Sequence, residues 1–306
     1  MRSRFRSDRG LTVRMTVTLF LLGLLYVGFV VALIVLLKSW LLVVVLIAAM
    51  FVAQFWFSDR IALFAMRGRV VEREEYPELH AVVDRLCALS DMPRPVVAVS
   101  AMDMPNAFAT GRSPRKAVVC VTTGLLDRLD PAELEGVLAH ELSHVAHKDV
   151  AVITVASFLG VIAGLIVRFA FYSQVFGGGR RDQNTAAVFA AVMGVSAAVY
   201  ALSFLLIRAL SRYRELAADR AAALLTGRPS ALASALAKVS GDIARIPTKD
   251  LRTAQAFNAF YFTPATGREP GIERFFSTHP TLEQRLGRLE RISAELGEPA
   301  APGKAG

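Results

Sequence analysis

The sequence has 306 residues, 54% of them hydrophobic, and its mean hydropathy is +0.44. This apolar content exceeds that of an ordinary soluble protein and predicts membrane-spanning segments. The formal net charge of +9 fits either a nucleic-acid-binding protein or a membrane protein with basic flanks. The arginines gather at the N-terminus and beside the apolar runs, not on one recognition element, so nucleic acid is not an expected partner. The two cysteines, Cys87 and Cys120, do not make a disulfide framework, and we expect both to be buried and reduced.

The first apolar region predicts a transmembrane hairpin over residues 16–57, after a basic N-terminal segment at residues 1–15. Residues 16–37 are long enough, at about 1.5 Å per residue, to cross a hydrocarbon core of about 30 Å. A Lys-Ser pair separates them from a second apolar run, which ends in aromatic residues as an interfacial belt would.

Residues 58–148 are more polar and predict a soluble part that contains helices and strands. The stretch YPELHAVVDRLCAL has apolar residues at helical spacing, and RPVVAVS predicts a strand. The stretch NAFATGRSPRKAVVCVTTG predicts two further strands joined by a turn. A helix then begins at Pro131, because Asp130 is a good N-cap and Glu133 completes a capping box.

A second transmembrane hairpin is predicted for residues 149–207. Its two apolar runs, at about 150–172 and 185–207, are rich in Ala, Gly and Ser, which favour close packing of helices in lipid. The chain is again polar and helical over residues 208–296, and residues 297–306 predict a disordered tail.

The strongest chemical motif is HELSH, residues 140–144. On a helix, His140 and His144 lie on one face about 6 Å apart, so both imidazoles can reach one zinc ion. Glu141 can point at the position where a water binds and take its proton as general base. The alternative, a surface helix with two incidental histidines, is disfavoured because the motif lies on a well-capped helix.

A third ligand is needed, and two other histidines are poor candidates. His147 lies a further turn along the same helix, and its spacing differs from that of a metzincin. We interpret it as an interfacial histidine near lipid headgroups. His80 is a lone histidine on a predicted helix, and we interpret it as structural.

Glu215 and Asp219, in the segment SRYRELAAD, are better candidates. They are four residues apart on a second helix, so Glu215 can bind zinc while Asp219 accepts a hydrogen bond from a ligand histidine. A solvated acidic face is the alternative, but the neighbouring residues are apolar. Two predicted spans separate His144 from Glu215, which returns both residues to the same side of the membrane. Both would lie roughly 10 Å from the hydrocarbon edge.

Three segments, GLLDRLDPAELEGVLAHELSHVAHKDV, RELAAD and STHPTLEQRLGRL, resemble HtpX-type membrane zinc metalloproteases, which are relatives of the CAAX-processing endoproteases. The resemblance extends over essentially the whole chain. It implies that His140, His144 and Glu215 bind one zinc ion and that Glu141 is the catalytic base. The expected fold is an α-helical membrane protein with four transmembrane helices, a small β-sheet and an α+β, gluzincin-like zinc protease domain.

The same resemblance implies that His279 and Arg285 lie near the transition-state oxygen. This is chemically reasonable, because a cation or an N–H donor aimed at a developing oxyanion lowers the barrier. The alternative for His279 is a helix-capping role before Pro280.

Asn106, Ala107 and Phe108 resemble the family's substrate-side strand. An extended substrate can pair with the edge of a sheet, and many proteases bind peptides in this way. An ordinary hairpin strand is an equally acceptable interpretation.

The positive-inside rule places the N-terminus, residues 58–148 and residues 208–296 on the cytoplasmic side of the cell membrane, although Lys38 and the GGGRR loop are exceptions. The expected partners are the lipid bilayer and protein substrates, mainly membrane proteins. The resemblance implies cleavage of misfolded or damaged membrane proteins in quality control and stress response. The alternatives are a processing protease for a defined membrane or lipidated substrate, and a non-catalytic, zinc-stabilised scaffold. Glu141 argues against the scaffold, since a structural zinc needs no general base.

Overall fold

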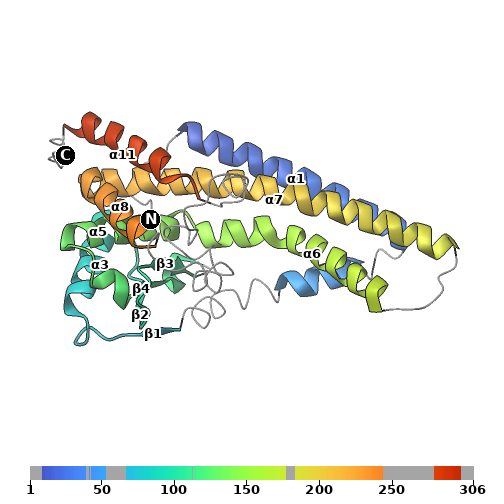
Figure 1. Ribbon diagram of the computed structural model, residues 1–306, viewed down its shortest axis with the longest axis horizontal. Coiled ribbons are helices and arrows are strands. Elements are labelled where there is room, and N and C mark those ends of the chain that lie inside the picture. The colour runs from blue at the N-terminus through green and yellow to red at the C-terminus, as the bar shows by residue number, and fades with distance from the viewer. Residues whose placement is uncertain are drawn as a thin grey trace. The chain divides into compact units, whose positions relative to one another are not determined.

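The computed structural model describes residues 9–38, 41, 43–52, 67–111, 113–176, 183–243 and 279–297 (Figure 1). Most of the predicted basic N-terminal segment and of the predicted disordered tail lies outside these residues. The chain divides into two compact units. The helical unit comprises residues 13–57 and 152–210, and the mixed unit comprises residues 1–12, 58–151 and 211–306.

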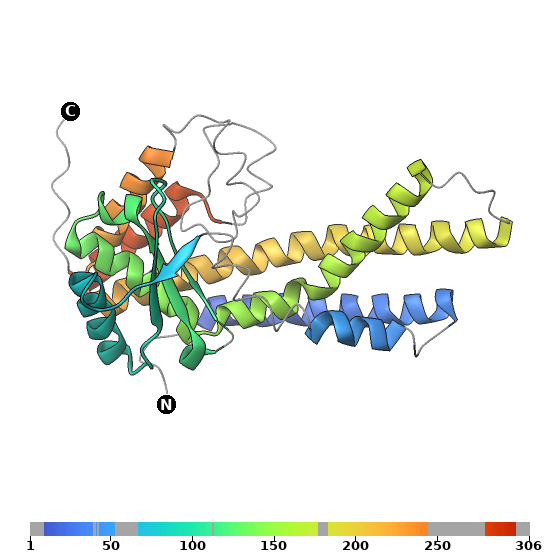
Figure 2. The same ribbon diagram turned by 90° about the horizontal axis from the view of Figure 1, so that it is seen from below.

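The helical unit is built from α1 (Arg9–Leu37), a helical stretch at Val43–Val52, α6 (Asp149–Phe176) and the first part of α7 (Gln183–Thr226) (Figure 2). Its core includes residues of all four helical stretches, and on α1 the buried apolar residues recur every three or four positions. This spacing gives one continuous stripe along a helix. The stripe on α1 consists of Leu22, Tyr26, Phe29 and Leu33.

Two helical stretches in the described part are long and apolar enough to cross a membrane, Thr12–Leu37 and Ala186–Thr226. They correspond to the first and fourth predicted spans. The second and third predicted spans contain shorter apolar stretches, Val43–Val52 and Ala156–Arg168. Residues 53–57, at the end of the second predicted span, lie outside the described residues. Among the residues that it describes, the structure therefore has two candidate membrane-spanning helices, where the sequence predicted four spans.

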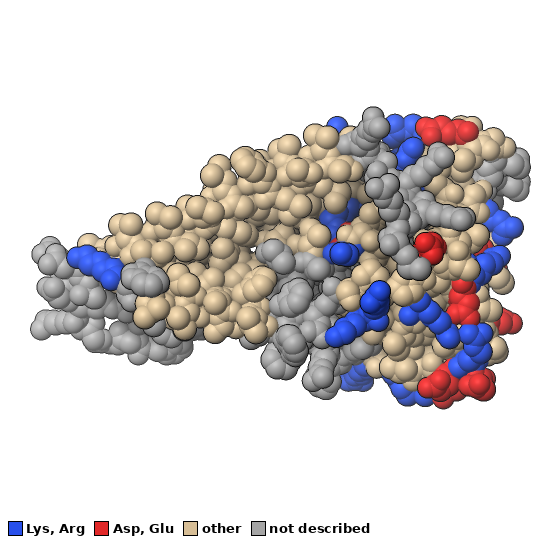
Figure 3. Space-filling model, turned by 180° about the vertical axis from the view of Figure 1, so that it is seen from behind, with Lys and Arg blue, Asp and Glu red and all other residues tan. Residues whose placement is uncertain are grey.

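The surface of the helical unit is apolar as well as its core. On α1, Phe20 is 69% exposed and Val27 is 63% exposed. A helix that is apolar on every face is typical of a membrane environment. On the face seen in Figure 3, charged side chains of both signs gather over the mixed unit, whereas few appear on the part of the helical unit that the structure describes.

A four-stranded sheet forms part of the mixed unit, in the order β1 (Gly68–Val70), β2 (Val96–Ser100), β4 (Val118–Thr122), β3 (Ala107–Thr110). β2 and β4 are parallel, whereas β1 and β3 run antiparallel to their neighbours. The predicted pairing of the two strands in NAFATGRSPRKAVVCVTTG is confirmed, with Phe108 opposite Cys120. β3 is therefore an edge strand of the described sheet.

Several helices complete the core of the mixed unit. They are α3 (Pro77–Ser90), α4 (Thr123–Leu126), α5 (Pro131–Ala146), the last part of α7, α8 (Pro229–Ile243) and α11 (Leu282–Leu296), with a short 3-10 helix, η1 (Pro114–Lys116). α5 packs against α3, α8 and β3. Cys87 and Cys120 are buried in this core and free, as expected.

The sequence around α5 explains both its start and its burial. Pro131 is its first residue, and the backbone N–H of Asp130 donates to Oε2 of Glu133 at 2.9 Å, which is half of a capping box. Leu138 and Leu142, one turn apart, are completely buried. Gly136 permits close approach of α8, because a Cβ atom there would lie 3.2 Å from Cα of Leu232. Contacts within the protein therefore hold α5 in position without the help of a metal ion.

Candidate metal centre

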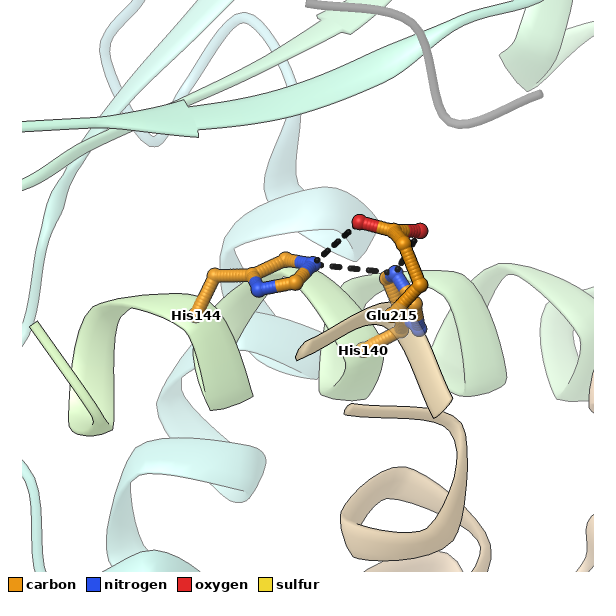
Figure 4. Close-up of side chains that lie close together, drawn as sticks. All are labelled: His140, His144 and Glu215. Carbon is orange, nitrogen blue, oxygen red and sulfur yellow. Dashed lines mark hydrogen bonds and ion pairs between the residues drawn. The ribbon is translucent and has the colours of Figure 1, made fainter. Parts of the chain in front are cut away.

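The three predicted zinc ligands converge on one point (Figure 4). The Nε2 atoms of His140 and His144 are 3.2 Å apart. Nε2 of His144 lies 3.4 Å from Oε1 of Glu215, and Nε2 of His140 lies 3.6 Å from Oε2 of the same carboxylate. Both imidazoles come from α5 and the carboxylate comes from α7 (Figure 4).

These separations match the size of a zinc site. Zinc–ligand bonds of about 2.1 Å at tetrahedral angles place neighbouring ligand atoms about 3.4 Å apart. Two imidazole nitrogens and one carboxylate oxygen are also the donor set of one class of catalytic zinc site. The site is largely closed to solvent, since the side chain of His140 is 1% exposed and that of Glu215 is 10% exposed. The residues present therefore fit a zinc ion in donor type, spacing and burial.

The other ring nitrogen of His140 is held by Asp219. Nδ1 of His140 lies 2.9 Å from Oδ1 of Asp219, and this carboxylate is completely buried. Arg285 donates to both carboxylate oxygens, from Nε to Oδ2 at 2.8 Å and from Nη2 to Oδ1 at 2.6 Å. A carboxylate that accepts the N–H of a ligand histidine fixes its tautomer and orientation. Asp219 therefore lies where a carboxylate can orient His140 in this way.

His144 has an equivalent partner that the sequence analysis missed. Its Nδ1 lies 2.6 Å from Oδ2 of Asp149, the first residue of α6. Arg214 pairs with the other oxygen of this carboxylate, and its Nη1 donates to the backbone oxygen of Asp149 at 2.8 Å. In the sequence, these contacts are indicated only by proximity to the ligands: Asp149 closely follows His144, and Arg214 directly precedes Glu215.

Glu141 lies on α5 next to the first ligand and faces the edge strand. Its Oε2 accepts a hydrogen bond from the backbone N–H of Ala109 at 3.0 Å. Burial raises the pKa of Glu141, while the neighbouring His140 and His144 act in the opposite direction. A raised pKa brings a carboxylate closer to the working range of a general base near neutral pH.

The predicted substrate-side strand coincides with β3, but its side chains are not what a substrate would meet. Asn106, Ala107 and Phe108 are all buried. The backbone oxygen of Asn106 accepts from the N–H of Thr122 in the neighbouring strand, whereas the N–H of Ala109 points to Glu141. Backbone groups of alternate residues face opposite sides of a strand, so Ala107 and Ala109 present theirs to the edge of β3 that does not pair with β4.

His279 also lies at this centre, whereas its alternative role is excluded. Nδ1 of His279 is 3.2 Å from Oε2 of Glu215, and its side chain is 6% exposed. The interpretation of His279 as a helix cap is wrong, because Thr281 is the N-cap of α11 and forms a capping box with Gln284. Arg285 lies further from Glu215, with Nη1 3.9 Å from Oε2, and is directed mainly at Asp219.

The two remaining histidines of the mixed unit lie outside this group. His147 follows the last residue of α5, and its Nδ1 is 2.8 Å from the backbone oxygen of Ser143. Burial lowers the pKa of His147. His80 is buried on α3 and contacts the backbone oxygen of Val71 at 3.2 Å.

The sequence and the fold have clear relatives. A protein from Streptomyces coelicolor named Protease HtpX homolog 1 is 85% identical over 305 residues, which is 100% of both chains. Protease HtpX homolog of Moorella thermoacetica is 52% identical over 300 residues, covering 97% of this chain and 99% of that protein. These relatives confirm the resemblance drawn from the sequence.

The crystal structure of S. mikatae Ste24p superposes with a TM-score of 0.53 at 19% identity, over 92% of this chain and 67% of that one, and shows a shared fold. Residues 73–293, which include every residue of the metal centre, match peptidase family M48. The chain therefore belongs to peptidase family M48.

Proposed function

We propose that this protein is a zinc-dependent endopeptidase of the cell membrane that cleaves misfolded or damaged membrane proteins on the cytoplasmic side. The observation that carries the proposal is the convergence of His140, His144 and Glu215, with Glu141 adjacent to them on the same helix. A purely structural zinc site has four protein ligands and needs no neighbouring base. Three ligands with a buried carboxylate beside them are the arrangement of a hydrolytic site.

Zinc bound by these three residues would supply Lewis-acid activation of a water molecule and of the scissile carbonyl. The chain supplies the proton transfers. Glu141 accepts the proton of the attacking water and later delivers it to the leaving amine, a role that its raised pKa favours. His279, which reaches Glu215 from the start of α11, is placed to donate a hydrogen bond to the negative charge that develops on the carbonyl oxygen. Arg285 holds Asp219, and thus His140, in position.

The edge of β3 that does not pair with β4 is the proposed binding site for the substrate backbone. An extended peptide would pair with the backbone of Ala107 and with the backbone oxygen of Ala109, whose N–H donates to the catalytic base. Main-chain pairing is largely independent of substrate sequence. This property suits an enzyme that acts on many unfolded segments.

The proposed topology has four spans, with both termini and the mixed unit in the cytoplasm. The two long apolar stretches support membrane insertion. The distribution of arginine in the sequence supports the orientation, since basic residues near the spans are retained on the cytoplasmic side.

The experiment uses the full-length protein in lipid nanodiscs with zinc. The substrate is a membrane protein reporter whose cytoplasmic loop is either intact or destabilised by substitution, and cleavage is followed by mass spectrometry. We expect cleavage of the destabilised loop at several sites, and none in the Glu141→Gln variant. Cleavage at a single site in both reporters would favour the processing protease instead. Zinc binding with no cleavage of any reporter or membrane extract would favour the scaffold.

A further inference from the structure

The zinc ligands sit in two similar arrangements of charged residues. In the first, His140 contacts Asp219, which is held by Arg285. In the second, His144 contacts Asp149, and Asp149 is held by Arg214. Each arrangement therefore consists of a ligand histidine, a buried aspartate and a buried arginine. Asp149 and Arg214, which complete the second arrangement, lie outside the motif HELSH.

Each of the three oxygen atoms of Asp149 makes a contact in the second arrangement. Its Oδ2 lies 2.6 Å from Nδ1 of His144, and its Oδ1 pairs with Nη2 of Arg214. Its backbone oxygen accepts from Nη1 of Arg214 at 2.8 Å. The guanidinium therefore holds both the side chain and the main chain of Asp149 at the point where α6 begins.

Burial makes this pairing mandatory. The side chain of Asp149 is 10% exposed and that of Arg214 is 3% exposed. A charge removed from water at this depth is costly unless a partner of opposite charge compensates it. Arg214 compensates the charge of the Asp149 carboxylate beside His144. A carboxylate that contacts Nδ1 of a ligand histidine favours the tautomer in which Nδ1 carries the proton, and this leaves the Nε2 lone pair of His144 available to bind a metal ion shared with Glu215.

α7 supplies a part of each arrangement. Glu215 is itself a ligand, and Arg214 precedes it directly in the chain. Asp219, one helical turn later, contacts His140. One stretch of α7 thus contributes one ligand and reaches both ligand histidines, one through Asp219 and the other through Arg214 and Asp149.

We propose that Asp149 and Arg214 are positioning residues of the metal centre, which fix His144 for zinc binding and make α7 the element that aligns all three ligands. This inference rests on the zinc site of the proposed function and deepens it. Loss of a carboxylate that supports a ligand histidine weakens metal binding by about 10-fold to 100-fold in other zinc proteins. We expect a loss of this size for Asp149.

The test measures zinc affinity of the full-length protein in nanodiscs by competition with a chromophoric chelator at constant pH. Asp149→Ala is expected to weaken zinc binding about 10-fold to 100-fold. Asp149→Asn should weaken it less, because an amide oxygen still accepts from Nδ1. Arg214→Lys keeps the charge but loses the planar guanidinium that donates two parallel hydrogen bonds. Its zinc affinity should lie between those of wild type and Asp149→Ala.

The matched control is Glu133→Ala. Glu133 is an equally buried carboxylate of α5 that binds Lys238 and Ser234 and does not contact the ligands. Its loss should lower thermal stability and leave the zinc dissociation constant unchanged. If Asp149→Ala does not fold, the zinc affinities of Asp149→Asn and Arg214→Lys are compared with that of wild type instead.

Zinc affinities of these variants within about twofold of wild type would overturn the inference and leave the proposed function intact. Failure of the wild-type protein to bind zinc would instead overturn the proposed function.

Discussion

Oδ1 of Asp219 lies 2.9 Å from Nδ1 of His140, while both oxygens of the same carboxylate accept hydrogen bonds from Arg285. Arg285 therefore acts on the metal centre through Asp219, although it comes from α11, far along the chain. Because Asp219 and Arg285 are 0% and 2% exposed, neither charge can be compensated by water.

Substitution of Arg285 tests this relationship. Arg285→Ala leaves the Asp219 carboxylate buried without its cation, which typically costs about 3–5 kcal/mol of folding free energy. We expect a large fall in the midpoint of thermal unfolding and a weaker zinc affinity. Arg291→Ala, on the exposed side of the same helix, is the control and should change stability by less than about 0.5 kcal/mol. Equal unfolding midpoints for the two variants would show that the pair does not stabilise the fold.

The third ligand is tested by comparing two side chains near His144. Glu215→Ala removes one of the three converging donors and should abolish zinc binding at stoichiometric metal. His147→Ala should retain one zinc per chain, because its ring contacts Ser143. Metal content after gel filtration, measured by atomic absorption, distinguishes the two variants. Zinc retained by Glu215→Ala and lost by His147→Ala would require a different ligand set.

His279 tests stabilisation of the transition state. Removal of one donor to a developing oxyanion typically costs a factor of about 10² to 10³ in kcat. His279→Ala should therefore lower kcat to this extent, with a nearly unchanged KM and intact zinc content. An alternative follows from its contact with Glu215 at 3.2 Å, which could instead serve to orient that ligand. A loss of zinc that parallels the loss of kcat would assign His279 to ligand orientation.

Much of this centre could be predicted because its signals are local. The helical spacing of His140 and His144 and the capping box at Asp130 both depend on residues within one helix. The link between His144 and Asp149 could not be predicted in this way. It depends on the path of the chain out of α5, which turns at Lys148 with a φ of 57° before α6 begins. Contacts made by Arg214 and Arg285 depend on tertiary packing that no local pattern encodes.

The difference between local patterns and tertiary packing also explains how far the membrane spans could be predicted. Residues 16–37 are long, apolar and uninterrupted, and the structure has one continuous helix there. The apolar stretch of α6 is shorter in the described part and ends at Arg168. α7, in contrast, continues beyond residue 207, where the fourth predicted span was expected to end, and carries Glu215 into the mixed unit. Hydropathy thus locates an apolar segment, but it does not show where the helix ends.

The proposed orientation is tested by thiol labelling in intact cells. Single cysteines at Lys38 and Gly178 should react with an impermeant reagent, whereas one at Gly303 should react only after the membrane is opened. The native thiols give little background, because burial raises the pKa of Cys87 to about 11 and that of Cys120 to about 12. Both should therefore remain protonated and unreactive at neutral pH. Labelling of Gly303→Cys in intact cells would reverse the proposed orientation.

The most direct test of the central claim is the hydrolysis rate of Glu141→Gln at equal zinc content. Glutamine keeps the size of the side chain and can still contact the N–H of Ala109, but it cannot accept the proton of the attacking water. The protein should bind one zinc per chain with wild-type affinity, and its kcat on a destabilised membrane protein should fall by several orders of magnitude. Near wild-type turnover by the zinc-loaded variant would show that Glu141 is not the catalytic base and would contradict the proposed mechanism.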